Sequence, residues 1–292
     1  MKINAVHSFT VSPFFTKPHN KFTMNDFEVM TMIMSALAWR RYNGSIKLYT
    51  DSYFAEWIYE NNLEFLWDNG IDLHLFENAK KNINKEIFWA ATKLDVIENM
   101  KVQEAHIDID FIMWKSINEQ VAEGDVVGSH FEDTGGEFTC YINKEKMMPP
   151  ENYIFPTKLD WSFPAINTSF VYFNSKDAKD LFCKECVRYM ENNNNKVYDD
   201  SGKDDVQMVF AEQRLTSMFL KFKNFDIRTI TNYAECKNET TGFTHLGGLK
   251  GALKRDHIAE ESYTMACVSK IKQDFSDFLE QISKVKCLKK YF

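Results

Sequence analysis

Short apolar segments alternate with longer stretches of helical apolar spacing along the first half of the chain. The apolar segments predict strands at 4–11, 46–49, 71–76 and 104–110, and the helical stretches predict helices at 26–43, 54–59 and 87–99. Strands that alternate with helices are typical of βαβ units, which build a mainly parallel sheet with helices on both faces. We therefore expect an α/β, Rossmann-like fold whose ligands bind beyond the carboxyl ends of the strands.

The second half of the chain continues this pattern less regularly. Strands are predicted at 126–127, 167–174 and 227–230, helices at 177–190 and 205–221, and a helical tail at 265–288. Met148-Pro-Pro-Glu151 interrupts the pattern, but candidate motifs lie on both sides of it, so we do not place a domain boundary there. The expected organisation is one domain over 1–264 followed by a helical, basic C-terminal tail over 265–292.

Composition narrows the function classes. The chain has 292 residues, is 44% apolar and 26% charged, and carries a formal net charge of −7. These values fit a globular protein and argue against a general nucleic-acid binder. No run approaches eighteen apolar residues, and the first residues show no signal-peptide pattern, so we expect a cytoplasmic protein.

The six cysteines have no framework spacing, which favours reduced thiols. Cys183 and Cys186 fit a C-x-x-C pattern, but they lie in a predicted amphipathic helix, which favours packing over redox or metal chemistry.

The stretch Glu104–Lys115 contains two aspartates, Asp108 and Asp110, that alternate with apolar residues. Residues two apart share one face of an extended segment, so both carboxylates are expected on the same side of a strand end. Buried acidic groups require compensation, and a divalent cation shared with substrate phosphates is one form of it. The alternative is a plain strand end with two solvated aspartates.

A second stretch, Phe243–Gly251, combines His245, Gly247, Gly248 and Lys250. Glycines let a backbone approach a phosphate closely, imidazole is a metal ligand, and lysine supplies a point charge for phosphate. Read alone, the stretch also fits a glycine-rich turn with one exposed histidine. Together with Asp108 and Asp110, it offers most of an octahedral Mn²⁺ or Mg²⁺ site completed by phosphate oxygens.

These motifs, in this order, resemble those of GT-A-fold glycosyltransferases, especially the retaining galactosyl- and glucosyltransferases of the glycosyltransferase family 8 type. The family's Asp-x-Asp motif is matched by 108–110, and its His-x-Gly-x-x-Lys motif by 245–250. Its acidic-Gln pair resembles Glu212-Gln213, with Glu where Asp is commoner. Its Asn-containing segment resembles Asn167-Thr-Ser169, and a basic residue before the Asp-x-Asp motif resembles Lys93.

The resemblance implies roles for these residues. Asp108, Asp110 and His245 would hold the cation, and Glu212 and Gln213 would lie at the transferred sugar. The residues implied in donor binding are Lys250, Gly247, Gly248, Lys93, Asn167 and Thr10. In the region of Thr10 the family usually has an Asp that reads uracil, and this chain has His7-Ser-Phe-Thr10 instead.

The implied function is transfer of a hexose from a nucleoside-diphosphate sugar, UDP-linked in this family, to a glycan or lipid-linked acceptor with retention, as in surface polysaccharide synthesis. Two alternatives remain open. One is a non-catalytic protein that binds a sugar nucleotide or a partner. The other is a nucleotidyltransferase, although such enzymes carry a glycine-rich loop after the first strand and 11–15 contains no glycine.

The acceptor side of the site is weakly specified. Trp161, next to Asp160 on a predicted loop, is the best acceptor-binding candidate among the tryptophans Trp89, Trp114 and Trp161, each of which also fits a core or wall position. The basic C-terminus fits either peripheral contact with the inner face of a membrane or a solvated helix end.

Overall fold

The computed structural model describes residues 2–11, 21–77, 82–132, 153–193, 206–232, 235 and 242–292. The fold is mixed α/β, as predicted, with a mainly parallel central sheet of seven strands among the described residues. The chain divides into two compact units. The first comprises Met1–His74, Ile107–Ser116 and Gly242–Phe292, and the second Leu75–His106 and Ile117–Thr241. The predicted division at residue 264 stays a prediction.

The first unit contains the strand order β3-β2-β1 and a separate two-stranded sheet of β5 and β9. Its strands are β1 (Ala5–Phe9), β2 (Ile46–Thr50), β3 (Ile71–Asp72), β5 (Phe111–Met113) and β9 (Phe243–His245). Its helices are α1 (Asp26–Tyr42), α2 (Ser52–Glu60), η1 (Glu64–Leu66), α9 (Leu249–Leu253), α10 (His257–Asp274), η4 (Ser276–Phe278), α11 (Leu279–Ser283) and η5 (Lys286–Leu288). Helix α3 (His74–Glu77) begins at the boundary between the units and continues into the second. The parallel pairs β1–β2 and β2–β3 are the βαβ pattern read from the sequence.

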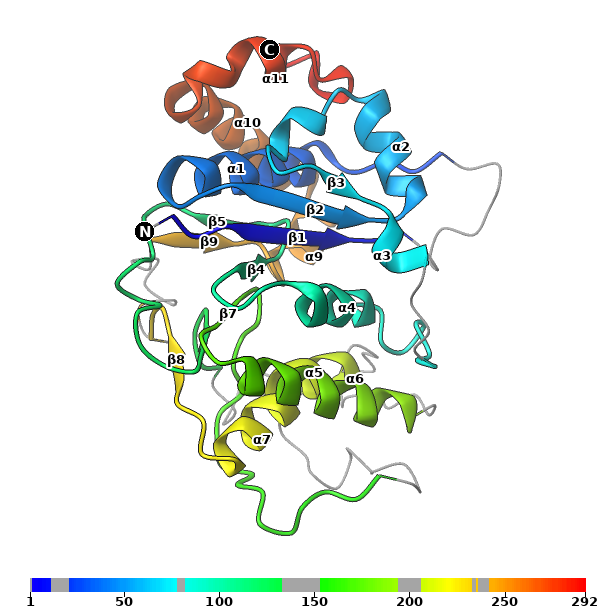
Figure 1. The fold of residues 1–292 in the computed structure, drawn as a ribbon. Helices are drawn as coiled ribbons and strands as arrows, with labels where there is room; N and C mark the ends of the chain where they lie inside the picture. Colours follow the sequence, from blue (N-terminus) through cyan, green and yellow to red (C-terminus); the bar gives the residue numbers. More distant parts are fainter. Residues whose placement is uncertain are drawn as a thin grey trace. The chain divides into compact units, whose positions relative to one another are not determined.

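Side-chain caps mark the starts of two helices in the first unit. Asn25 and Glu28 form a capping box at α1, and the Asp51 side chain accepts the Phe54 N–H at the start of α2. Helix α1 is buried along most of its length and packs beside α10 (Figure 1). The C-terminal region is helical, as predicted, but α10 already begins at His257.

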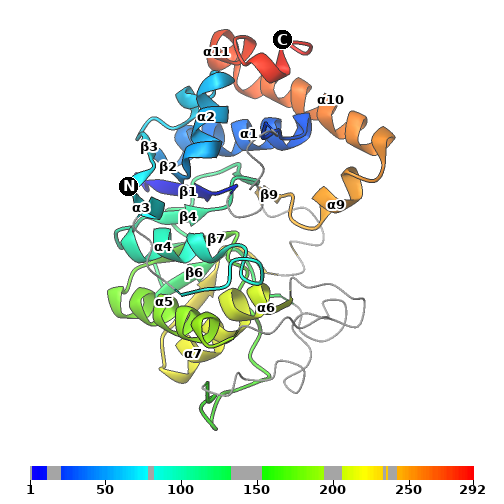
Figure 2. The same ribbon diagram turned by 90° about the vertical axis from the view of Figure 1, so that its right-hand side faces the viewer.

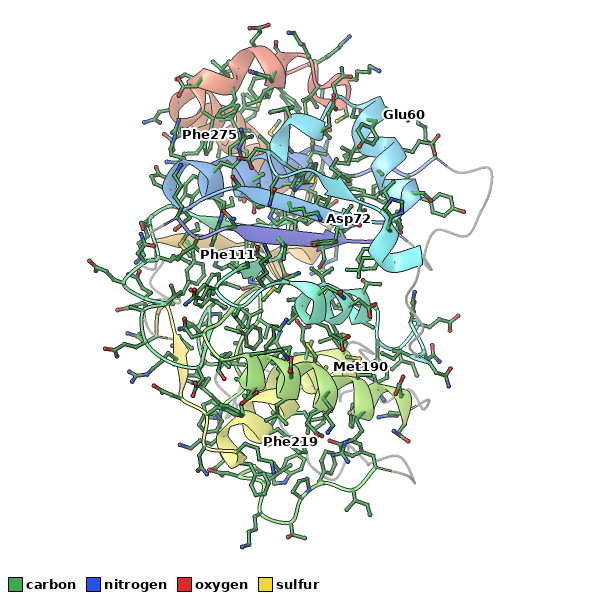
Figure 3. The ribbon with its side chains drawn as sticks, in the orientation of Figure 1. Glu60, Asp72, Phe111, Met190, Phe219 and Phe275 are labelled. Carbon is green, nitrogen blue, oxygen red and sulfur yellow. The ribbon has the colours of Figure 1, made fainter. Side chains whose placement is uncertain are left out.

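The second unit contains the strand order β4-β7-β6-β8, with β6 antiparallel to β7 and parallel to β8. The strands are β4 (Ala105–Ile107), which ends at the boundary between the units, β6 (Val126–Gly128), β7 (Phe170–Phe173) and β8 (Ile227–Thr229). The helices are α4 (Ala91–Asn99), α5 (Lys176–Glu191), α6 (Val206–Val209), the π-helix η3 (Phe210–Leu215) and α7 (Thr216–Phe222). Helix α5 packs against both α4 and α7 (Figure 2), and Met190 and Phe219 are buried there (Figure 3).

Three local predictions need correction. The strand expected at 71–76 stops at Asp72, because the Asp72 side chain accepts the His74 N–H and turns the chain into α3. The helix expected from 87 begins at Ala91. Residues 108–110 form a turn and not an extended strand end. The interruption at Met148–Glu151 and the predicted helix start at Asp205 lie outside the described residues.

A buried relay of hydrogen bonds ties four segments of the first unit together. The Trp67 indole N–H donates to His7 Nδ1 at 3.2 Å, which leaves the imidazole proton on Nε2. That group lies 3.0 Å from Ser35 Oγ, and the Ser35 hydroxyl donates to the carbonyl of Phe111. The relay therefore runs from the segment after η1 through β1 and α1 to β5, the strand that follows the two aspartates.

Burial lowers the pKa of His7 to about 3, although the charge of Asp110 opposes the shift. An unfolded histidine titrates near pH 6.5, so below that pH the unfolded state binds the additional proton. Stability should then fall as the pH falls from 6.5 towards 3.

Replacing His7 by Gln removes this titration. The loss of unfolding free energy between pH 7 and pH 5 should be smaller in His7→Gln than in wild type by about 2 kcal/mol, measured by urea unfolding. His257→Gln alters a histidine with a 90% exposed side chain and should lose as much stability as wild type. Equal losses in His7→Gln and wild type would show that His7 is not held neutral.

Candidate functional site

The two aspartates lie on the turn that joins β4 to β5. Strand β4 ends at Ile107, and the Phe111 N–H donates to the Asp108 carbonyl at 2.9 Å, closing the turn. Asp110 is buried and Asp108 is partly exposed. The turn, and not strand alternation, brings the two carboxylates to the same place.

Strand β9 brings the second motif to this turn. It pairs antiparallel with β5, and Phe111 lies opposite His245. The Leu246 N–H extends the pairing to the Asp110 carbonyl at 3.3 Å. The ring of Phe111, which Figure 3 labels, stacks on Phe243 with centroids 4.8 Å apart. Residues 108–110 and 245–250 are therefore neighbours although more than 130 residues separate them.

Among the described residues, Asp108, Asp110 and His245 form a group whose potential ligand atoms all lie within 4.8 Å of one another. His245 Nε2 lies 3.8 Å from Asp110 Oδ2. Two carboxylates and one imidazole suit Mn²⁺, and a set of three protein ligands leaves positions for water or substrate phosphate oxygens. The donor set therefore fits a divalent cation such as Mn²⁺ or Mg²⁺.

Lys250 and the backbone of Gly247 contact the buried carboxylate. Lys250 Nζ lies 2.8 Å from Asp110 Oδ2, and the Gly247 N–H donates to the same oxygen at 3.1 Å. Burial alone would raise the pKa of Asp110, but His245, Lys250 and the Gly247 N–H outweigh it and hold that pKa below its ordinary value. Burial likewise acts to lower the pKa of Lys250, and the charge of Asp110 reverses this and raises it. Asp110 is therefore an anion and Lys250 a cation at neutral pH.

The two glycines of the motif have different roles. Gly247 has φ +34°, and a Cβ built there would lie 3.1 Å from His245 Cε1. A side chain at Gly247 would therefore press on the imidazole. Gly248 has φ −64° and nothing within 4 Å of a built Cβ. Its surroundings are open to a ligand.

In the second unit, Lys93 on α4 forms a buried ion pair with Glu212 on η3. Lys93 Nζ lies 2.7 Å from Glu212 Oε1 and donates to the Thr168 carbonyl at 2.6 Å. The Thr168 hydroxyl donates to the same Glu212 oxygen at 2.7 Å. Both charged side chains are about 7% exposed, so each requires the other. Lys93 and Glu212, which the resemblance assigns to binding of the sugar donor, are therefore held together as an ion pair.

Asn167 lies in an adjoining buried network that sequence reasoning missed. Its side-chain amide donates to Glu132 Oε1 at 2.6 Å, and its carbonyl oxygen accepts from the Ser129 hydroxyl at 2.9 Å. His130 Nε2 lies 3.4 Å from Glu132 Oε1. The available signal was the polar run Ser129-His-Phe-Glu132 directly after the apolar strand β6.

The remaining predicted site residues are Gln213, Asp160, Trp161 and Thr10. The Gln213 carbonyl accepts the Ile166 N–H at 3.3 Å. Asp160 is exposed, and hydrogen bonds from the Ser162 hydroxyl and N–H lower its pKa. Trp161 is half-buried against Phe210. Thr10 directly follows β1 and is partly exposed, and its donor-binding role stays a prediction.

The other two tryptophans differ in their surroundings. Trp114 donates to the Thr244 hydroxyl at 2.9 Å, which makes it part of the β5–β9 region. Trp89 is 49% exposed. No helix in the described part of the chain is long and apolar enough to cross a membrane.

Fold and site together define an α/β protein with a cluster of potential metal ligands, in which the buried Asp110 pairs with the partly exposed Lys250. Residues 1–285 match the family described as "Family of unknown function (DUF6734)", and the chain belongs to that family. No curated protein matches it.

Several solved structures are similar to the chain at low sequence identity. One is titled "PaToxG Glycosyltransferase", with 9% identity, 90% of this chain and 78% of that chain covered, and a TM-score of 0.42. Another is the galactosyltransferase LgtC in complex with donor and acceptor sugar analogues, with 8% identity, coverage of 78% and 73%, and a TM-score of 0.40. A third is mouse xyloside xylosyltransferase 1 in its apo form, with 9% identity, coverage of 78% and 85%, and a TM-score of 0.38.

The two glycines allow a matched test of the metal cluster. Gly247→Ala places a Cβ in a left-handed conformation and against the His245 ring, so Mn²⁺ affinity should fall about fivefold to tenfold. Gly248→Ala meets no neighbour and should bind Mn²⁺ as wild type does. Isothermal titration calorimetry with Mn²⁺ alone measures both. Equal affinity in the two variants would exclude His245 as a ligand in this arrangement.

The buried ion pair of the second unit allows a second test. Lys93→Met leaves the Glu212 carboxylate buried without its lysine and should lower the unfolding free energy by about 3 kcal/mol. Combining it with Glu212→Gln removes the charge, so most of that loss should be recovered. Lys176→Met breaks the exposed pair with Asp180 and should leave stability nearly unchanged. Additive losses in the double variant would contradict the coupling.

Proposed function

We propose that this protein is a metal-dependent glycosyltransferase of the GT-A type, similar to family 8. It transfers a hexose from a nucleoside-diphosphate sugar, UDP-linked in the simplest case, to a glycan or lipid-linked acceptor, as in surface polysaccharide synthesis. The grouping of Asp108, Asp110 and His245 within 4.8 Å, next to Lys250, carries this proposal. We place the protein in the cytoplasm, with at most peripheral membrane contact.

The residues of the first unit act on the donor diphosphate in this proposal. Asp108, Asp110 and His245 would hold Mn²⁺ or Mg²⁺. A bound cation of this kind supplies charge stabilisation at the leaving diphosphate. Lys250 adds a positive charge fixed by Asp110, and the backbone around Gly247 and Gly248 lets the diphosphate approach closely.

The residues of the second unit act on the transferred sugar. One oxygen of Glu212 is held by Lys93 and Thr168, and a carboxylate has lone pairs for further donors such as sugar hydroxyls. Asn167 is oriented by Glu132 and Ser129, which suits it to bind a further hydroxyl. Gln213 lies next to Glu212 on η3, and we assign it the position beside the anomeric carbon. Trp161 and Asp160 bind the acceptor.

The transfer proceeds with retention in this proposal. The acceptor oxygen forms a bond to the anomeric carbon on the face from which the diphosphate leaves. The bond from that carbon to the phosphate oxygen breaks, and the phosphate oxygen takes the proton of the acceptor hydroxyl. No separate protein base is required, because the leaving group itself accepts the proton.

The test is an assay with Mn²⁺ and a panel of sugar nucleotides, scoring release of nucleoside diphosphate and of pyrophosphate. Slow hydrolysis of one donor supports the glycosyltransferase. Pyrophosphate release supports a nucleotidyltransferase, and donor binding without turnover supports a non-catalytic binding protein. Either of the last two results rejects the proposal.

Removing single ligands should abolish this activity without unfolding the protein. Asp108→Asn and His245→Ala should each lower Mn²⁺-dependent release of nucleoside diphosphate by at least about 100-fold, because metal affinity depends on every ligand. Asp277→Asn changes an acid with a 79% exposed side chain in the same unit and should retain full activity. Near-wild-type rates in either ligand variant, with thermal unfolding unchanged, would reject the metal site.

A further inference from the structure

The π-helix η3 is held along its length by one neighbouring segment of the second unit. Short π-helices are rare and concentrate at functional sites. Residues of η3 and α7 contact 161–168 through four hydrogen bonds: Arg214 Nη2 to the Trp161 carbonyl at 2.6 Å, Ser217 Oγ to the Pro164 carbonyl at 2.8 Å, the Ile166 N–H to the Gln213 carbonyl at 3.3 Å, and Thr168 Oγ1 to Glu212 Oε1 at 2.7 Å. Two of these hydrogen bonds reach Glu212 and Gln213, the residues assigned to the transferred sugar.

Trp161 is held to η3 at two points. Its carbonyl accepts from Arg214, and its ring stacks on Phe210 with centroids 6.1 Å apart and planes at 16°. Phe155 packs against the edge of the same ring. The tryptophan is only half-buried, so part of its surface remains available to a ligand.

Arg214 supplies the hydrogen bond that links η3 to Trp161. Arg214 is 6% exposed, and burial of a guanidinium is costly unless hydrogen bonds compensate it. A backbone carbonyl contacted by a charged donor forms one of the stronger hydrogen bonds in proteins. Arg214 also directly follows Gln213, so the residue that reaches Trp161 starts beside the residue assigned to the anomeric carbon.

We propose that Arg214 is a positioning residue that fixes Trp161 against the π-helix carrying Glu212 and Gln213. It thereby sets where a sugar acceptor on Trp161 lies relative to the transferred sugar. This proposal rests on the proposed function for the roles of Trp161 and Gln213, and on the geometry of the second unit for the attachment itself.

The attachment predicts which rate changes when Arg214 is lost. Hydrolysis of the donor uses water, which does not have to bind to Trp161. Transfer to a sugar requires the acceptor to be bound against Trp161. Loss of Arg214 should therefore lower transfer relative to hydrolysis, whereas a general weakening of the fold would lower both rates together.

The first experiment compares Arg214→Met, Arg214→Lys and Trp161→Ala. With Mn²⁺ and the donor that wild type hydrolyses, each protein is given increasing methyl glucoside or methyl galactoside as acceptor probe. Arg214→Met should lower the ratio of transfer to hydrolysis about tenfold, as loss of one charge-assisted hydrogen bond implies. Arg214→Lys retains a donor and should recover part of it. Arg228→Met, which removes an arginine of this unit with a 51% exposed side chain, should leave the ratio unchanged.

The double variant Arg214→Met with Trp161→Ala separates positioning from independent effects. It should be no worse than Trp161→Ala alone, because Arg214 acts through Trp161. A multiplicative loss in the double variant, or a parallel loss of hydrolysis and transfer in Arg214→Met, would overturn the proposal.

A second measurement needs no activity. Acrylamide quenching of the Trp161 fluorescence, taken as the difference from Trp161→Phe, should be stronger in Arg214→Met than in wild type. Unchanged quenching would reject the attachment even in an active enzyme. Increased quenching in a protein that hydrolyses no donor would retain the attachment and reject the proposed function instead.

Discussion

The pairing of β5 with β9 is the constraint on which the candidate metal site depends. Only three residue pairs form it, yet they join segments separated by about half of the chain. A pairing this short has little stability of its own, because hydrogen bonds contribute modestly and closing a long loop costs entropy. The surroundings supply the rest: Ser35 on α1 donates to the Phe111 carbonyl, and Lys270 on α10 lies over the Trp114 ring. Helices α1 and α10 thus indirectly stabilise the position of the candidate metal ligands.

In the second unit, buried charged residues are stabilised by an ion pair and by side-chain hydrogen bonds. The unit's buried polar residues come from helix α4, the π-helix η3 and the segment before β7, where charged groups would be destabilising alone. Lys93 and Glu212 neutralise each other, Thr168 donates to Glu212, and Asn167 donates to Glu132. The π-helix adds one residue to the turn that carries Glu212 and Gln213, which changes the direction in which following side chains point.

Much of this arrangement could be predicted from local sequence signals. Apolar segments and helical apolar spacing located most of the strands and helices, because both signals act within a few residues. Asp108, Asp110, His245 and Lys250 were grouped through their chemistry and order, and the structure places them together. The turn at 108–110 was missed because alternating apolar and acidic residues look the same in a strand and in a strand–turn–strand. Strand β5 was missed because it follows the turn directly and its apolar residues continue the pattern of the strand before it. Strand β9 was missed because it opens the stretch that resembles a glycine-rich turn.

Glu132 and Arg214 of the second unit were not predicted for a different reason. Glu132 is fixed by Asn167, and Arg214 is fixed by Trp161, in each case through contacts between segments 35 or more residues apart. No local pattern encodes such pairs. The π-helix could not be predicted from the sequence either, because over six residues its periodicity hardly differs from that of an α-helix.

The charges of the candidate site in the first unit link the proposed cation to the proposed diphosphate ligand. Asp108 and Asp110 carry two negative charges and Lys250 one positive charge, so these three side chains sum to −1. A diphosphate approaching that arrangement alone would be repelled. With a divalent cation added the sum becomes +1, which attracts a diphosphate.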